Sequence, residues 1–273
     1  MVKSTVKLPT NALLEALNLR PKHVFVSGAS RGIGEATARL LGDKNFNLTL
    51  ASRSYNRLLG VAMDIGTQKA HAVTMDLADE NSIDAAVAAA ESRFGPIDIM
   101  ICNAAVHAET PLDDVSVEAR QTFRRVIDVN LVGTFFLAQL ATQHMPSHGR
   151  VLFIGSTLGR FGAPRTHAYS ASKHALLGLA RGMAHELSRR NIRVNVVNPG
   201  WVDTRMARDA LQSMAQAAGE TLQQVTAQQI GQQPVRRMIK PIEVAAYLEF
   251  LIGPGGDAIT GQGIDISGGA VMV

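Results

Sequence analysis

The sequence is poor in several kinds of residue, and each shortage limits what the protein can be. It has 273 residues with one cysteine, Cys102, and 5% aromatic residues. A single cysteine excludes an internal disulfide and fits a reducing compartment, so we expect a cytoplasmic protein. The net charge is only +4 and there is no run of five or more Lys or Arg. Nucleic-acid binding is therefore not expected.

The first 22 residues lack a long apolar run. The short apolar cluster between Leu13 and Leu19 is interrupted by Glu15 and Asn18, so it is too short for a signal peptide or a membrane span. We interpret residues 1–22 as an extension, either a short amphipathic helix or an irregular segment. The remainder, residues 23–273, suits one domain with a large core, and no repeat or linker indicates a second.

What the chain does have is a regular alternation of apolar strands and helices. Strands are predicted at residues 23–26, 47–51, 70–75, 97–101, 150–154, 193–197 and 263–266. Helices are predicted at 35–42, 55–65, 82–94, 115–144 (as one or two helices), 168–190 and 242–252. Buried strands separated by helices predict an α/β fold with a doubly wound, Rossmann-like parallel sheet and helices on both faces. In such sheets the ligand binds beyond the carboxyl ends of the strands.

A glycine-rich turn follows the first predicted strand. Gly28, Gly32 and Gly34 stand in the pattern GxxxGxG. Residues without side chains let the backbone approach a pyrophosphate, and the N-terminus of the following helix faces the anion. A purely structural turn would have the same glycines, but the position in the first strand-turn-helix unit favours a dinucleotide site.

Tyr169 and Lys173 are four residues apart in the segment predicted to be the longest single helix. This spacing places a phenol and an ammonium one turn apart on the same face. The reference pKa of tyrosine is about 10. We expect the neighbouring cation to lower that pKa, so that Tyr169 exchanges protons near neutral pH.

These motifs, taken in order, resemble the short-chain dehydrogenase/reductase family. The glycine turn is similar to TGxxxGIG with Ser27 in place of Thr, and residues 102–105 are similar to NNAG with Cys102 and Ala105 as replacements. Ala105 tolerates a positive φ less well than glycine, which puts one backbone contact of that turn in doubt. Residues 198–204 are similar to the family's PG motif. The resemblance runs from residue 23 to the C-terminus.

The resemblance implies roles for individual residues. The catalytic residues would be Asn130, Ser156, Tyr169 and Lys173. The cofactor would contact Gly28, Ser30, Arg31, Gly32, Ile33, Gly34, Arg53, Asp76, Leu77, Asn103, Ala104, Tyr169, Lys173, Pro199, Gly200, Val202 and Thr204. The substrate pocket would include Val106, His107, Leu158, Phe161 and Trp201. No metal is expected, because the histidines lack a clear ligand spacing.

Some of these residues also have ordinary structural interpretations. Asp76, which would read the adenine amino group, could instead cap the helix predicted near Ser82. Cys102 fits a small buried hydrophobic residue better than a reactive thiol. Asn130 could satisfy backbone groups at a helix kink, and in the family that kink also holds a water linked to the lysine.

Cofactor preference is predicted from charge. The second strand is followed by Ser52-Arg53-Ser54, without the acidic residue that repels a 2′-phosphate in NAD-dependent relatives. Arg53 and Arg31 offer donors for that phosphate, so NADP(H) is favoured over NAD(H). In the alternative, Arg53 is a solvated loop residue that stacks on adenine.

Residues 203–237 correspond to the variable lid of the family. They carry an apolar stripe at helical spacing beside many glutamines, which fits either an amphipathic helix packed on the body or a hinged lid over an apolar substrate. Arg205 and Arg208 could face a carboxylate or a phosphopantetheine. The C-terminal segment 259–269 resembles relatives that assemble as tetramers, so a homo-oligomer, tetramer or dimer, is expected.

We therefore predict an NADP(H)-dependent ketone reductase, with β-keto acyl or polyketide-like carbonyls as the favoured substrates. One alternative is a secondary alcohol or sugar dehydrogenase that works in the oxidative direction. Another is a cofactor-binding regulatory protein with a vestigial site, against which the four intact catalytic positions argue. No membrane partner is expected.

Overall fold

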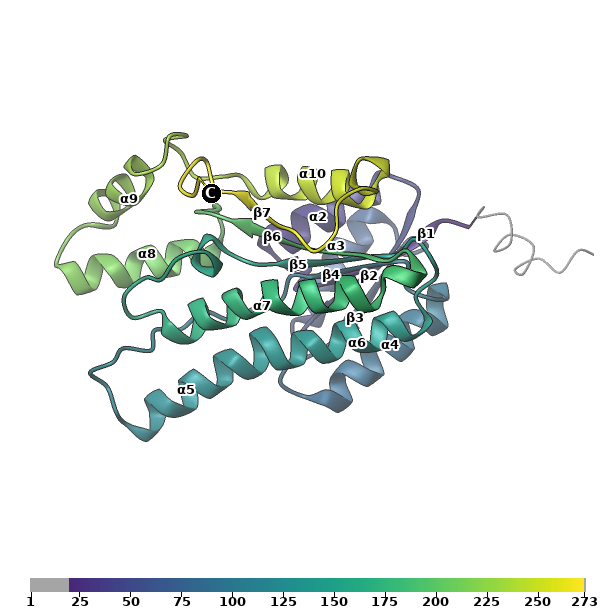
Figure 1. Cartoon of the computed structure of the whole chain (residues 1–273), viewed down its shortest axis with the longest axis horizontal. Coiled ribbons are helices and arrows are strands. Elements are labelled where there is room, and N and C mark those ends of the chain that lie inside the picture. Colours follow the sequence, from purple (N-terminus) through teal and green to yellow (C-terminus); the bar gives the residue numbers. More distant parts are fainter. Residues whose placement is uncertain (1–19, 273) are drawn as a thin grey trace, which may run out of the picture.

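The computed structural model describes residues 20–272, which form a three-layer α/β structure around a parallel sheet (Figure 1). The predicted extension at 1–22 lies outside the described residues except for its last three. The strands are β1 (Lys22–Ser27), β2 (Phe46–Ser52), β3 (Ala70–Thr74), β4 (Ile99–Cys102), β5 (Arg150–Ile154), β6 (Arg193–Pro199) and β7 (Gly263–Ile266). Their order in the sheet is β3-β2-β1-β4-β5-β6-β7, with every pairing parallel. The predicted doubly wound fold is confirmed.

Helices cover both faces of the sheet. One face carries α2 (Gly32–Gly42), α3 (Tyr55–Ile65) and α10 (Pro241–Ile252), and the other carries α4 (Glu80–Phe94), α5 (Val117–Ile127), α6 (Thr134–His144) and α7 (His167–Glu186) (Figure 1). Two further helices, α8 (Arg205–Ala218) and α9 (Leu222–Gly231), project past the edge of the layers at which the strands end. The chain switches direction at β1 and β4, so a crevice opens beyond the ends of these neighbouring strands.

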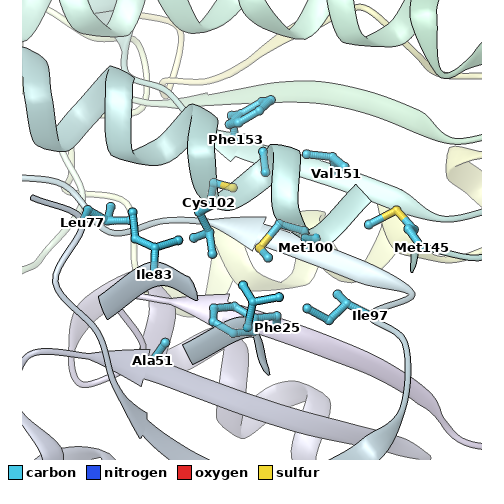
Figure 2. Close-up of a cluster of buried hydrophobic side chains, with 14 of the residues drawn as sticks. Phe25, Ala51, Leu77, Ile83, Ile97, Met100, Cys102, Met145, Val151 and Phe153 are labelled. Carbon is cyan, nitrogen blue, oxygen red and sulfur yellow. The ribbon is translucent and has the colours of Figure 1, made fainter. Parts of the chain in front are cut away.

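The central strands are apolar because both of their faces are covered. All residues of β4 and β5 are buried, and Phe25, Met100, Cys102 and Phe153 meet in one cluster (Figure 2). Cys102 is thus a core residue, as predicted, and burial raises the pKa of its thiol well above the usual range.

Several predicted boundaries were wrong for local reasons. The helix predicted at 35–42 begins at Gly32, inside the glycine turn. The helix predicted from 168 to 190 ends at Glu186 and is followed by a short 3₁₀ turn, Ser188–Arg190. The predicted lid stripe at 203–237 is divided between α8 and α9, because Gly219 ends α8 in the left-handed conformation (φ +66°).

The segment 115–144 forms two helices joined by one π-helical stretch, Asp128–Gly133. The continuous helical run Val117–His144 is long and apolar enough to cross a bilayer by length and composition alone. Half of its most apolar window is nevertheless buried inside the protein. This burial is what a helix packed on the sheet requires.

Candidate active site

The glycine turn is held by contacts that leave no room for side chains. Gly28 and Gly32 have φ of +69° and +61°, and a Cβ added to Gly34 would lie 2.4 Å from the carbonyl oxygen of Gly28. Ser27 Oγ accepts hydrogen bonds from the amides of Asn103 and Ala104, at 2.9 and 3.0 Å. The hydroxyl that replaces the family's threonine therefore ties the ends of β1 and β4 together.

The turn after β4 is intact despite its two replacements. Asn103 Nδ2 donates to the carbonyls of Ser27 and Gly28, at 2.9 and 3.1 Å. Ala105 has no positive φ, so the expected strain at this position is absent. The backbone follows a conformation that alanine adopts without cost.

Tyr169 and Lys173 lie one turn apart on α7, and Ser156 follows β5. Lys173 Nζ lies 5.6 Å from the centroid of the Tyr169 ring and donates to the carbonyl of Ile154 at 2.6 Å. Ser156 Oγ accepts from the amide of Leu158 at 3.1 Å, and it hydrogen-bonds with the Tyr169 hydroxyl. The side chains of Tyr169 and Lys173 are buried, so little of either polar group is exposed to solvent.

The protonation of this wall differs from the sequence-based expectation. Burial raises the pKa of Tyr169 to about 12, although the hydrogen bond with Ser156 acts in the opposite direction. Burial also lowers the pKa of Lys173 to about 8. Removing a phenolate from water costs more than the hydrogen bond with Ser156 returns here. Tyr169 is consequently a protonated phenol at neutral pH, the state from which a general acid acts.

Asn130 lies behind the cavity, in the π-helical stretch between α5 and α6. Its side chain accepts from the amide of Val106 and donates to the carbonyl of Val106, both at 2.8 Å, and it also donates to Ser172 Oγ at 3.3 Å. The predicted kink is present, and π-turns of this kind often occur at functional sites. Asn130 fixes the segment that begins the substrate side of the cavity.

One cavity of about 1130 Å³ brings most of the predicted residues together. All the predicted cofactor and substrate residues line it except Gly34, and of the four predicted catalytic residues only Asn130 does not. Gly34 acts through the packing of the turn described above. His107 lines the cavity and contacts Tyr169 edge to face, with 5.0 Å between ring centroids, and burial lowers its pKa.

Asp76 is free for the role that the resemblance implies. The helix that follows is capped by Asp79, whose side chain accepts from the amide of Asn81, and it begins at Glu80. The capping alternative for Asp76 is therefore wrong. Its carboxylate accepts from the amide of Ala78 at 3.1 Å and lines the cavity.

Three arginines gather at the end of the cavity formed by the glycine turn and β2. Arg31 and Arg53 were predicted, whereas Arg57 was not. Within residues 20–272 none of the three has an ion-pair partner. Arg57 lies in the first turn of α3, where the helix dipole also favours an anion. The sequence could have indicated Arg57 as a third phosphate-binding residue, because it follows Arg53 by only four positions.

Comparisons with known proteins agree with this geometry. The family model described as short chain dehydrogenase matches residues 22–215. The chain is 34% identical to 3-oxoacyl-[acyl-carrier-protein] reductase MabA of Mycobacterium tuberculosis, over 92% of this chain and 93% of that one. It is 32% identical to a putative ketoacyl reductase of Streptomyces coelicolor, over 90% and 95%. Among solved structures, a variant of actinorhodin polyketide ketoreductase with NADPH superimposes with a TM-score of 0.85 at 29% identity, over 92% and 97%.

Proposed function

Because the chain belongs to the short-chain dehydrogenase family, we propose that it reduces the ketone of a β-keto acyl or polyketide-like substrate to a secondary alcohol with NADPH. The observation that carries the proposal is the shared cavity. Ser156, Tyr169 and Lys173 form its wall at one end, and the other end is lined by three arginines that have no ionic partner among residues 20–272. Relatives named as ketoacyl reductases support the reaction class.

The residues present fit a dinucleotide with a 2′-phosphate. The turn at Gly28 and Gly34 is so compact that a Cβ at either position would meet backbone atoms at 2.8 Å or less, and residues 30–33 of the turn line the cavity. Arg31, Arg53 and Arg57 offer charge-assisted hydrogen bonds to a phosphate. Asp76 would accept from the adenine amino group, and the segment from Pro199 to Thr204 would lie beside the nicotinamide.

The chemistry that the nicotinamide supplies when bound is hydride transfer to the substrate carbon. The protein orients that carbon and controls the proton. Ser156 donates a hydrogen bond to the carbonyl oxygen, where negative charge develops. Tyr169 donates its proton to the same oxygen as the C–H bond forms, which yields the alcohol. The Lys173 ammonium then stabilises the tyrosinate left behind.

The protonated state of Tyr169 suits the acid step of a reduction. A pKa of about 12 keeps the phenol protonated across the neutral range, so the general acid is available without prior proton uptake. The same group takes up the proton when the reaction runs backwards, so the preference for reduction over an oxidative sugar or alcohol dehydrogenase comes from the relatives named as ketoacyl reductases.

Tyr169→Phe provides the direct test. The substitution removes the acidic proton and leaves the ring and its burial unchanged. We expect turnover of a β-ketoacyl thioester to fall by roughly 10²–10⁴, the usual contribution of general acid catalysis, while NADPH affinity measured by fluorescence titration changes less than about threefold. Retention of more than half the activity would show that Tyr169 is not the acid.

The assembly and location complete the proposal. We assign residues 23–273 to one catalytic domain whose lid comprises α8 and α9. The exposed apolar side chains of α5 and α10, among them Phe123 and Phe250, support a homo-oligomer, either a tetramer or a dimer. The single cysteine and its burial support function in the cytoplasm.

A further inference from the structure

Helix α8 carries two apolar strips with different surroundings. Leu211 and Ala215 are buried and pack against Val225 of α9 and against Trp201. The second strip faces the active-site cavity and repeats at helical spacing; it consists of Ala207, Ala210, Met214, Ala217 and Ala218. Met214 remains 36% exposed. Packing of the lid onto the body therefore uses only part of the apolar surface of α8.

The second strip extends the catalytic cavity away from the reacting atoms. It lines the same cavity as Ser156 and Tyr169. From Ala210 to Ala218 the helix rises about 12 Å, at 1.5 Å per residue. An extended chain covers about 1.2 Å per single bond, because a residue of three bonds spans 3.3–3.6 Å. The strip is thus long enough to lie along about ten consecutive carbon–carbon bonds.

The groove along this strip of α8 is apolar and hollow, whereas Arg205, Gln229 and Gln232 line other parts of the same cavity. Four of the five side chains are alanines, which line a wall without filling the space in front of it. Phe161 lines the same cavity while 45% exposed, so an apolar occupant would remove its ring from water. Arg208, one of the charged groups expected to face substrate, does not line the cavity and pairs with Asp203 at 2.7 Å. Nothing on the strip would bind a charged or strongly polar group.

We propose that this groove holds the acyl tail of the substrate, and that the protein is selective for β-ketoacyl thioesters with tails of about ten carbons beyond the ketone. The inference rests on the proposed function. Burial of one methylene contributes about 0.8 kcal/mol. This corresponds to an affinity up to about fourfold higher for each methylene that the groove holds. Selectivity therefore rises with tail length until the chain passes Ala218.

The test compares β-ketoacyl thioesters of four, eight and twelve carbons on one thiol carrier, with kcat/KM measured for each. We expect the value for twelve carbons to exceed that for four carbons by at least tenfold. Ala217→Trp fills the groove and should lower the twelve-to-four ratio at least tenfold. Gln216→Trp is the matched control, because Gln216 is exposed on the neighbouring position of α8 and does not line the cavity; it should keep the wild-type ratio.

Each failure has a distinct meaning. Equal kcat/KM at all lengths, or an equal effect of both tryptophans on the ratio, would overturn the groove while leaving the reductase intact. A fused bicyclic ketone reduced as well as the twelve-carbon substrate, and insensitive to Ala217→Trp, would also overturn it. Turnover of no β-ketoacyl thioester would instead refute the proposed function. Should Ala217→Trp fail to fold, Ala217→Leu, which keeps helix propensity, should lower the ratio at least threefold.

Discussion

Replacing Lys173 with methionine is expected to stabilise the protein while abolishing its turnover. Burial lowers the pKa of Lys173 from 10.5 to about 8. At 1.36 kcal/mol per pKa unit, holding the ammonium charged at pH 7 costs the folded state about 3 kcal/mol. Methionine has a similar length and no charge, but it also removes the charge-assisted hydrogen bond to the carbonyl of Ile154, worth about 1.5–3 kcal/mol. The net expected gain at pH 7 is therefore at most about 1.5 kcal/mol.

The sign of the pH dependence gives this prediction its specificity. Because the folded pKa lies below the unfolded value, the unfolded chain binds more protons between pH 8 and pH 10.5. The stability of the wild type therefore rises with pH over that interval. Between pH 7 and pH 10, the free energy of unfolding of the wild type should therefore rise by about 2–3 kcal/mol relative to that of Lys173→Met.

Urea unfolding followed by circular dichroism at both pH values measures the effect. Lys69→Met, which removes an exposed lysine, is the control for losing one positive charge, and its difference from the wild type should stay constant. Turnover of Lys173→Met should fall at least a hundredfold. Two results would refute the idea that the buried ammonium destabilises the protein and is kept for catalysis. One is a Lys173→Met variant that is clearly less stable than the wild type at pH 7, and the other is a difference in unfolding free energy that does not change with pH.

Three other predictions concern the cofactor, the fold and the lid. Arg53→Asp should weaken NADPH binding by roughly ten- to a hundredfold, because a charge-assisted contact worth about 1.5–3 kcal/mol becomes a repulsion. Paired kinetic assays should show a shift of preference toward NADH, and a wild type that uses NADH as well as NADPH would contradict the prediction. Burial lowers the pKa of His23 from 6.5 to about 4, so the free energy of unfolding should fall as pH drops from 6.5 to 4, by up to about 3 kcal/mol more than in His23→Asn. Equal losses of stability in the two proteins, measured by urea unfolding, would disprove this. Limited proteolysis should cut first near Gly219, between α8 and α9, and NADPH with a good ketone should slow the cut; cleavage elsewhere, or cleavage indifferent to ligand, would mean that the lid is fixed.

Much of the fold follows from patterns local in the sequence. Buried strands such as Arg150–Ile154 and helices such as Tyr55–Ile65 were predicted with their observed bounds, because apolar periodicity and turn residues act over a few positions. The glycine turn and the Tyr169 and Lys173 pair are also local patterns. Their family order was enough to predict that they meet at the ends of the strands.

The sequence by itself therefore determined the fold class, the family and about half of the residues that line the cavity. Only the tertiary structure decided the protonation of Tyr169 and Lys173, the addition of Arg57 to the phosphate end, and the hollow strip along α8. These properties depend on which atoms surround a group after folding, because burial changes the cost of a charge and sets the space left beside a small side chain. Spacing along the chain records which residues share a helix face, but not how much water that face retains.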